Sequence, residues 1–494
     1  MVTALNATLA ALVLLGAWLW RRLSLQRSAG GIATSATVRS GRMVGLVLRR
    51  LLRKGRFWLQ GRLASRERRA RLHTEYHVRS ATEMTEALGQ MKGVFMKIGQ
   101  ILSFADDSLP PEAKAIMAGL QQSAPPMDFA LTRRAVEAEL GGDLASAFRQ
   151  FDEEPIAAAS IGQVHRAELR DGTVVAVKVQ YPGVDAAIEK DLQATDGLAA
   201  MIGVFNRNID AKAVVAELTE RMADELDYRI EAHNQALFHR LWAGHPLIRI
   251  PAVYRELTTK RMLVQQFQRG LGYRDFLAVS STEDRNLTAH VLSDFVWDSM
   301  FRFHVFNGDP HPGNYLFHDD GGMTFLDFGC IKYFPTERLA AVLRLFESLV
   351  REDREAFRRA CEELLLVLPG RPFDGQFLWD FFRYQAGPYI RDEIFTFTPA
   401  YLQQAREVMD LLKLQRINLP ADLLFFNRIT FGLNAIFSDL GARANFYRVY
   451  ERYLYPERNL PPALASLGIT LPPVFLQAAR APQPAVPRGT VSHA

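Results

Sequence analysis

The sequence predicts an α+β protein in which a small strand-containing lobe precedes a larger, mainly helical lobe. Residues 155–181 are rich in β-branched side chains and contain a hairpin signal, Asp171-Gly172. From Thr282 onward the pattern is mostly helical. A compact strand–loop–strand region, Asp309–Phe328, interrupts the helices and carries polar residues. These observations place polar motifs at the junction of two lobes.

Helices are expected before the first strand. Apolar residues recur at alternating steps of four and three, which places them on one face of a helix. They are Met84, Leu88, Met91, Phe95, Ile98 and Leu102. Pro110-Pro111 would end this helix. A short helix at Glu112–Ser123 would follow, and a third would run from Thr132 to Leu140 before Gly141-Gly142.

Later elements follow from the same patterns. After Pro182-Gly183 the chain is predicted to be helical to about His239. Short strands are expected near Ile248–Tyr254 and Arg261–Phe267. The helical lobe is expected to contain a strand at Met323–Leu326 and a helix at Pro335–Val350.

Size and composition fit a two-lobed body with additions. The chain has 494 residues, of which 48% are apolar, so it can bury a large core. Its two cysteines, Cys330 and Cys361, cannot form a disulfide framework, which favours a reducing compartment for most of the chain.

Positive charge is concentrated near the N-terminus. Residues 1–20 carry no charged side chain, whereas residues 21–80 carry a net charge of +14. The rest of the chain must then be negative, because the total is only +5. A basic excess often indicates nucleic acid. Here it follows an apolar segment directly, which favours anionic membrane lipid and predicts no nucleic-acid partner.

The apolar segment, Val2–Trp20, contains nineteen uncharged residues. A membrane-spanning helix needs about 20 residues. Trp18 and Trp20 suit an interface, and Arg21-Arg22 would keep the following residues in the cytoplasm. We therefore expect an anchor, single-pass or peripheral, in the cell (inner) membrane. A cleaved signal peptide fits less well because no basic region precedes the apolar run.

A phosphate-binding loop is predicted at Ala157–Val164. Aligned with the pattern G-x-G-x-x-G-x-V, the segment keeps Gly162 and Val164 but has alanine at the first two glycine positions. Alanine is less permissive than glycine, so the loop should be stiffer. A buried turn of small residues would give the same pattern. The candidate nucleotide-binding residues here are Ala157, Ala158, Ala159, Ser160, Ile161, Gly162 and Val164.

Lys178 follows sixteen residues after Gly162, at the end of Val175-Ala176-Val177-Lys178. This segment fits the strand whose lysine contacts the α- and β-phosphates and pairs with a glutamate on a helix. Glu225 is the candidate partner. Other acids compete on spacing alone, and a solvated acidic face would look the same. They are Glu217, Glu220, Asp224 and Glu231.

The most specific pattern lies in the helical lobe. Asn314 follows Asp309 by five residues, and Asp327-Phe328-Gly329 follows Asn314 after thirteen. In phosphotransferases the first aspartate orients the nucleophile or accepts its proton, and the asparagine and second aspartate hold Mg²⁺. The spacing predicts an ATP and Mg²⁺ site, with Asp309 as catalytic acid, in a two-lobed protein-kinase-like fold. No A-P-E motif follows, so a protein substrate is not favoured.

Taken as a set, these motifs resemble those of the UbiB/ADCK (AarF-type) family of atypical kinases over roughly residues 80–455. The matching segments are Lys97-Ile98-Gly99-Gln100, Ala157–Ser160, Glu225-Leu226-Asp227, Gly308–Asn314 and Asp327-Phe328-Gly329. The resemblance implies nucleotide and divalent-metal binding (Mg²⁺, with Mn²⁺ as a substitute), ATPase activity, membrane association and a role in isoprenoid quinone biosynthesis or lipid homeostasis.

Residue roles follow from the same resemblance. Lys178 would pair with Glu225, and Asp227 would be a second acidic residue of that motif. Asn314 and Asp327 would be metal ligands. Lys97, Gly99 and Gln100 would belong to a helical extension that covers the active site. One departure is Gln266 at the hinge, where many relatives have glutamate.

These patterns divide the chain into an anchor (1–22), a basic linker (23–80), a helical extension (81–150), a strand-containing lobe (151–270), a helical lobe (271–478) and a disordered tail (479–494). We expect a membrane-associated, ATP-dependent phosphotransferase or ATPase. Its partners would be membrane lipids, quinone precursors and quinone-biosynthesis enzymes. A nucleotide-sensing scaffold is the main alternative, and a Ser/Thr protein kinase is a weaker one.

Overall fold

The computed structural model describes residues 68, 127–159, 161–186, 188, 223–308, 311–367, 374–414 and 421–476. The chain divides into two compact units. Unit 1 comprises Met1–Ile230 and Val253–Phe267, and unit 2 comprises Glu231–Ala252 and Gln268–Ala494. The predicted anchor, the helix predicted at residues 84–102 and the predicted tail lie outside the described residues and stay predictions.

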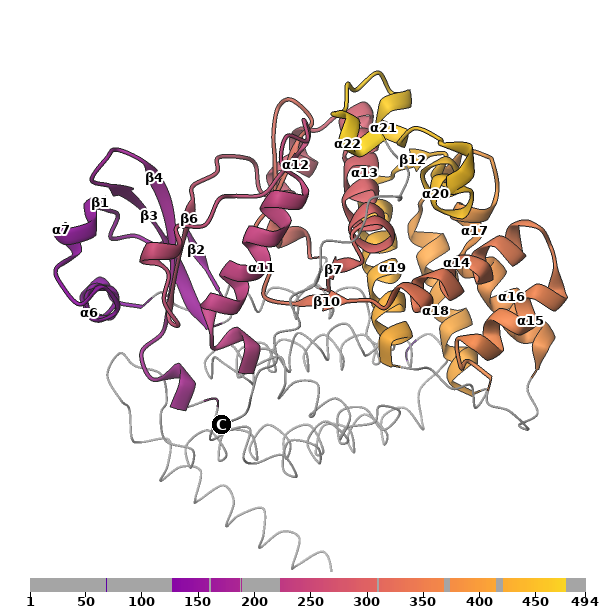
Figure 1. Cartoon of the computed structure of the whole chain (residues 1–494), viewed down its shortest axis with the longest axis horizontal. Helices are drawn as coiled ribbons and strands as arrows, with labels where there is room; N and C mark the ends of the chain where they lie inside the picture. Colours follow the sequence, from indigo (N-terminus) through magenta and orange to yellow (C-terminus); the bar gives the residue numbers. More distant parts are fainter. Residues whose placement is uncertain are drawn as a thin grey trace, which may run out of the picture. The chain divides into compact units, whose positions relative to one another are not determined.

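Unit 1 contains a five-stranded sheet in the order β1-β3-β4-β6, with β2 paired to β3 (Figure 1). Its strands are β1 (Phe148–Phe151), β2 (Ala157–Ala158), β3 (Gly162–Leu169), β4 (Val174–Gln180) and β6 (Met262–Gln266). All of its pairings are antiparallel. The predicted β3–β4 hairpin is confirmed, and Gly172 in its turn has a φ of +90°, which glycine adopts without strain.

Helix α6 (Phe129–Leu140) packs on this sheet. It begins three residues before the predicted Thr132, because Asp128 caps it by accepting a hydrogen bond from the Ala130 amide at 2.8 Å. Gly141, with a φ of +68°, ends it as predicted. Val136 of α6 is fully buried against Val177 of β4, so an apolar layer between helix and sheet forms the core of unit 1.

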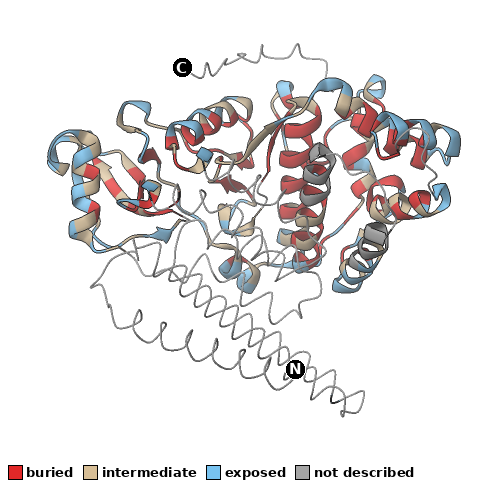
Figure 2. Cartoon of the chain, turned by 90° about the horizontal axis from the view of Figure 1, so that it is seen from below, coloured by how far each residue is buried: buried red, intermediate tan, exposed pale blue. Residues whose placement is uncertain are grey.

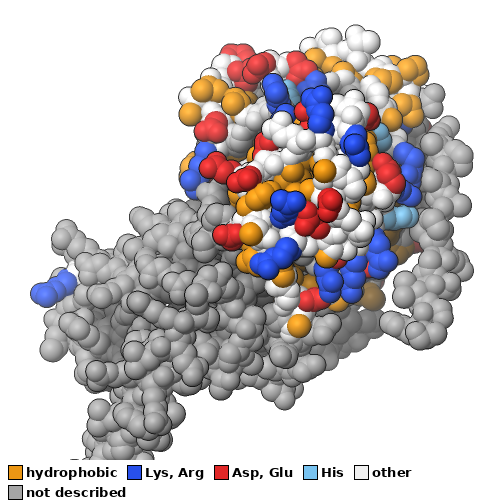
Figure 3. All heavy atoms as spheres, turned by 90° about the vertical axis from the view of Figure 1, so that its left-hand side faces the viewer, with side chains coloured by type: hydrophobic (Ala, Val, Ile, Leu, Met, Phe, Trp, Pro, Cys, Tyr) orange, Lys and Arg blue, Asp and Glu red, His pale blue; other side chains and the backbone are white. Residues whose placement is uncertain are grey.

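The surface of unit 1 carries paired charges. Acidic and basic side chains are interspersed on the face seen in Figure 3. Arg166 lies 3.4 Å from Asp152, and Arg149 pairs with Glu168. Exposed pairs of this kind contribute about 0.2–1 kcal/mol each. The buried apolar layer therefore accounts for most of the stability of this unit.

Helix α11 (Tyr228–Leu241) corrects one prediction. The chain was expected to be helical from Pro182-Gly183 to about His239. In the described residues, however, the helix is interrupted at Leu226-Asp227. Asp227 Oδ1 accepts a hydrogen bond from the Arg229 amide at 3.0 Å, as a capping carboxylate does. The Tyr228 amide donates to Lys260 O at 3.0 Å, across to another segment of unit 1. The acidic motif therefore lies at a break between a helical segment that ends at Glu225 and α11.

Unit 2 is mainly helical, and its described residues form three small sheets. Its strands are β5 (Ile248–Arg249), β7 (Val305–Asn307), β8 (Tyr315–Phe317), β9 (Met323–Phe325), β10 (Ile331–Tyr333), β11 (Phe395–Thr396) and β12 (Arg443–Ala444). The orders are β5-β9-β8, β10-β7 and β11-β12. β5 is shorter than the strand predicted at Ile248–Tyr254, because Pro251 lacks the N–H needed to extend a ladder.

Helix α13 (Thr282–Trp297) is buried along most of its length (Figure 2) and packs against α19 (Ala421–Leu440), α20 (Phe446–Leu454) and α21 (Ala463–Ser466). The others are α12 (Tyr273–Val279), α14 (Thr336–Val350), α15 (Arg354–Glu363), α16 (Gly375–Gln385), α17 (Gly387–Ile390), α18 (Pro399–Leu414) and α22 (Pro473–Leu476). α14 confirms the helix predicted at Pro335–Val350. Ser281 and Asp284 form a capping box that starts α13.

A buried ionic cluster follows α13. The chain continues from α13 as a π-helical turn, Asp298–Arg302, before β7. Asp298 accepts a hydrogen bond from the Tyr453 hydroxyl at 2.7 Å, and Arg452 Nη2 lies 3.8 Å from its carboxylate. Burial, reinforced by the charge of Asp298, raises the pKa of Asp294. The cluster ties α20 to the segment that leads into β7.

Within the described ranges, no helix combines the length and apolar character that crossing a membrane requires. The predicted anchor at residues 1–22 lies outside these ranges.

His245 in unit 2 is held as a neutral acceptor. Its Nδ1 accepts hydrogen bonds from the amides of Ile248 at 2.9 Å and Leu247 at 3.3 Å. Its ring packs 4.9 Å from that of Phe475. Burial lowers the pKa of His245 to about 4.

Replacing His245 should reduce the acid sensitivity of the fold. The unfolded state takes up a proton near pH 6.5 and the folded state does not, so His245 lowers stability as pH falls. Between pH 7 and pH 5 this loss is about 2 kcal/mol. Urea unfolding of His245→Asn, which keeps an acceptor, should show a pH dependence shallower by that amount. His245→Phe should reduce the pH dependence by the same amount, but this variant should be less stable than His245→Asn. An unchanged pH dependence in both variants would contradict this prediction.

Candidate functional site

The predicted phosphate loop is the turn between β2 and β3. Ala157 pairs with Val164 and Ala158 with Gln163, and the Ala159 amide donates to Gly162 O at 2.9 Å. Ala157 and Ala158 are exposed. Ser160 lies outside the described residues. The alanines therefore lie on a short, hydrogen-bonded hairpin rather than on a glycine-rich turn.

Gly162 is required by close packing. A Cβ at this position would lie 2.2 Å from Val179 O and 3.0 Å from the Tyr228 hydroxyl. The first distance leaves no room for a side chain because Val179 O is backbone, and the second would require the Tyr228 hydroxyl to move. The single glycine that the loop retains thus lies where the backbone of β4 leaves no room for a Cβ. Next to it, Ile161 O accepts a hydrogen bond from the Tyr181 amide at 2.9 Å.

Lys178 lies on β4, between Val164 of β3 and Leu263 of β6. Its side chain is partly exposed, and its Nζ lies 5.0 Å from the centre of the Tyr228 ring. A cation at this distance is attracted by the face of an aromatic ring. Since Tyr228 directly follows the Glu225-Leu226-Asp227 motif, unit 1 brings Lys178 close to the acidic segment.

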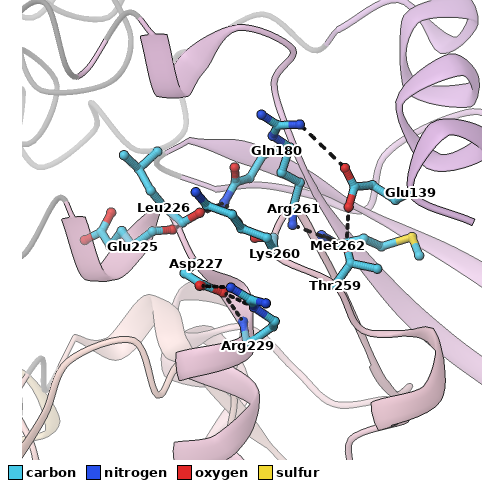
Figure 4. Close-up of polar contacts among 10 residues, drawn as sticks. All are labelled: Glu139, Gln180, Glu225, Leu226, Asp227, Arg229, Thr259, Lys260, Arg261 and Met262. Atoms are coloured by element: carbon cyan, nitrogen blue, oxygen red, sulfur yellow. Dashed lines mark hydrogen bonds and ion pairs between the residues drawn. The ribbon is translucent and has the colours of Figure 1, made fainter. Parts of the chain in front are cut away.

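Gln180 holds that acidic segment against the sheet. Its Nε2 donates to Leu226 O at 3.1 Å and lies 3.4 Å from both Glu225 O and Lys260 O (Figure 4). Gln180 is 3% exposed, so these carbonyls cannot rely on water at this point. The interruption before α11 is therefore stabilised by one buried amide.

Asp227 and Glu225 differ in their surroundings. The Arg229 guanidinium donates to Asp227 at 2.9 and 2.6 Å, and this hydrogen bonding lowers the pKa of Asp227. In Figure 4 the Glu225 side chain points away from this pair. Asp227 thus has a structural partner, whereas pairing of Glu225 with Lys178 stays a prediction.

The second part of the predicted site lies in unit 2. Asn314 ends a 3-10 turn, Pro312–Asn314, whose preceding His311 accepts a hydrogen bond from the Gly313 amide at 3.0 Å. Asn314 O accepts from the Leu326 amide at 3.0 Å. This bond ties Asn314 to the strand that ends just before Asp327. Asp309 lies outside the described residues, so its place in the site stays a prediction.

Asp327 is part of a tightly held turn. Its Oδ1 accepts a hydrogen bond from the Gly329 amide at 3.0 Å. Its backbone O accepts from Asn307 Nδ2 at 2.5 Å, and Phe328 O accepts from Asn234 Nδ2 at 3.1 Å. Asn307 directly precedes the predicted catalytic loop, and this position in the sequence could have identified Asn307 as a supporting residue. Asn234 carries no such signal in the sequence.

Glu231 competes with Glu225 as the partner of Lys178. Glu231 is 5% exposed, and its Oε2 would lie 4.0 Å from a Cβ at Gly329. Glu225 is partly exposed. Both acids have polar interactions, so Glu231 stays a competitor of Glu225 for Lys178.

Mg²⁺ suits the residues present. Asp327 offers a carboxylate and Asn314 an amide oxygen, and Mg²⁺ prefers oxygen ligands. Among the described residues, no three His, Cys, Asp or Glu side chains cluster closely enough to hold a metal by themselves. Mg²⁺ normally keeps waters and binds substrate phosphates as well, so a site with few protein ligands is compatible with it.

Gln180→Met should loosen the acidic segment. The variant keeps the volume of the side chain but leaves the carbonyl of Leu226 without its buried donor, which costs about 1–3 kcal/mol. Urea unfolding should show this loss, and amides of residues 224–228 should exchange faster with deuterium. Gln150→Met is the control, because Gln150 is exposed and bonds only to Asp152 at 2.9 Å. An equal loss in both variants would contradict the assigned role.

Comparisons with known proteins identify the family. Residues 119–361 match the ABC1 atypical kinase-like domain. The chain is 32% identical over 322 residues to the atypical kinase COQ8B, mitochondrial, of Rattus norvegicus, covering 61% of each protein. It is 29% identical over 411 residues to an uncharacterized protein of Synechocystis, covering 78% of this chain and 70% of the relative.

The curated relatives are longer than the region they share with the chain. The matched region of this chain spans 61% of the rat protein. It spans 41% and 46% of two chloroplastic proteins of Arabidopsis thaliana. A solved structure, the complex of Rv3197 with erythromycin from Mycobacterium tuberculosis, aligns with a TM-score of 0.55 at 30% identity. That alignment covers 76% of this chain and 94% of the solved chain, and it supports the kinase-like fold. The chain belongs to the UbiB/ADCK family of ABC1-type atypical kinases.

Proposed function

We propose that this protein is a membrane-associated atypical kinase or ATPase that binds ATP with Mg²⁺ and supports isoprenoid quinone biosynthesis or membrane lipid homeostasis. The observation that carries the proposal is the Asp327 turn, in which the Gly329 amide fixes one carboxylate oxygen. A carboxylate held in one orientation is what a metal–nucleotide complex requires.

The proposed roles follow from position. Backbone amides of the Ala157–Gly162 hairpin would face the nucleotide phosphates, and Lys178 would contact the α- and β-phosphates. Asn314 and Asp327 would hold Mg²⁺, which offsets the phosphate charge when bound. Asp309 would orient the acceptor or take its proton. Lys97, Gly99 and Gln100 would cover the site from the helical extension.

One observation and one prediction favour a small-molecule or lipid acceptor, or hydrolysis alone. After Asp327-Phe328-Gly329 the chain forms β10 at once, and α14 begins at Thr336. Residues 330–335 are too few for an activation segment that binds a peptide. The proposed anchor at residues 1–22 and the basic linker behind it would hold the kinase-like lobes at the cytoplasmic side of the inner membrane.

Asp327→Asn should abolish the activity. Asparagine keeps the size of the side chain but removes the charge that binds the metal, so Mg²⁺-dependent ATPase activity of the full chain should fall about a hundredfold or more. Asp320→Asn is the matched control, since Asp320 lies on the β8–β9 turn and pairs with Arg249 at the surface. It should keep nearly full activity. Absence of nucleotide binding and of ATPase activity in the unaltered protein would refute the proposal.

A nucleotide-sensing scaffold is the second candidate, favoured by the alanine hairpin in place of a glycine-rich loop. The two candidates differ in what a catalytically disabled variant can do. A deletion strain should regain normal quinone and lipid content with the unaltered gene. If Asp309→Asn also restores it and Lys97→Ala does not, turnover is dispensable and the scaffold is correct. If Asp309→Asn fails, the protein acts as an enzyme.

A further inference from the structure

One face of α11 lies against the Asp327-Phe328-Gly329 turn. Residues three and four apart on a helix share a face, and Glu231, Asn234 and Phe238 have this spacing. Glu231 lies near Gly329, as described above. Asn234 Nδ2 donates to Phe328 O at 3.1 Å. The ring of Phe238 lies 4.9 Å from that of Phe328.

Phe328 is held at two points by this face. Its side chain is fully buried and packs on Phe238, which is also fully buried. Its carbonyl accepts the hydrogen bond from Asn234, which is only 8% exposed. A buried carbonyl without a donor loses free energy, so the amide of Asn234 restricts how this peptide can rotate.

The peptide unit that Asn234 holds is the one that binds Asp327. The carbonyl of Phe328 and the amide N–H of Gly329 belong to a single planar peptide. That N–H donates to Asp327 Oδ1 at 3.0 Å. Because the plane is rigid, fixing the carbonyl on one side sets the direction of the N–H on the other. Asn307 holds the preceding peptide in the same way, through Asp327 O at 2.5 Å.

We infer that Asn234 is a positioning residue: by holding the Phe328–Gly329 peptide, it sets the orientation in which the Asp327 carboxylate meets the metal. The role of Asn234 rests on the metal role proposed for Asp327. In this proposal Asn234 acts through the backbone and is not itself a metal ligand. Its loss should therefore weaken metal binding, whereas loss of a comparable buried carboxamide elsewhere on α11 should not.

Gln235 provides a matched control on the same helix. Gln235 is fully buried, and its Nε2 donates to Pro251 O at 2.9 Å. Both residues thus use a buried carboxamide to hold a backbone carbonyl of unit 2. Only the carbonyl held by Asn234 belongs to the turn that contains Asp327. A general effect of losing a buried hydrogen bond should appear equally in both variants.

The experiment measures Mn²⁺ binding to the full-length protein by electron paramagnetic resonance, in the presence of a non-hydrolysable ATP analogue. Asn234→Leu should raise the dissociation constant for Mn²⁺ about tenfold, which corresponds to about 1.4 kcal/mol. Gln235→Leu should change it less than twofold. Both should lower the urea midpoint of unfolding by similar amounts. Asn234→Ala and Gln235→Ala, which add no atoms, repeat the comparison if the leucine variants do not fold.

Asp327→Asn distinguishes a failure of the positioning role of Asn234 from a failure of the metal role proposed for Asp327. If it abolishes Mn²⁺ binding while the Asn234 variants bind like wild type, the positioning role of Asn234 is wrong and the proposed metal role stands. If the Asn234 and Gln235 variants lose affinity equally, the effect is only structural and the inference is again wrong. If Asp327→Asn binds Mn²⁺ as tightly as wild type, the metal role fails, and the role of Asn234 fails with it.

Discussion

Buried carboxamide side chains hold the irregular backbone on which the candidate site depends. Helices and sheets satisfy their own N–H and C=O groups, but the segments at Leu226-Asp227 and at Asp327–Gly329 are irregular and cannot do so. Gln180 supplies the donor for the acidic segment in unit 1, and Asn234 and Asn307 supply donors for the Asp327 turn in unit 2. Each amide replaces hydrogen bonds that water would provide at an exposed loop.

Neutral amides suit this task better than charged side chains. A buried lysine or arginine would impose a positive charge next to the acidic groups and would carry a large desolvation cost. A carboxamide donates to a carbonyl without changing the local charge. The charges of the site are thus left to the residues proposed to act on the nucleotide, Lys178 in unit 1 and Asp327 in unit 2, while the uncharged amides determine where the backbone lies.

The alanine hairpin of the predicted phosphate loop is also held in one conformation, in this case by backbone contacts. Its turn is closed by the hydrogen bond from the Ala159 amide to Gly162 O, and its glycine is retained where β4 leaves no space for a Cβ. The loop is therefore constrained on both sides. In unit 2 the connection from Asp327-Phe328-Gly329 to α14 is also short.

Local sequence determined the elements whose signals lie within a few residues of each other. The Asp171-Gly172 turn, the end of α6 at Gly141 and the helix before Val350 follow from turn residues, caps and periodicity. The set of motifs from Lys97 to Gly329 resembles that of the UbiB/ADCK family, and the comparisons confirm this family. The break at Asp227 was missed although an aspartate cap was present, because the acidic run has a helical pattern on both sides.

Only the tertiary structure decided which side chains support those motifs. Asn234 and Phe328 are 94 residues apart, and Gln180 and Leu226 are 46 residues apart. An asparagine or glutamine in a sequence gives no indication of which distant carbonyl it will meet, since that depends on how helices and strands pack. The charged motifs can therefore be recognised from the sequence. The uncharged amides that orient them can be identified only from the folded structure.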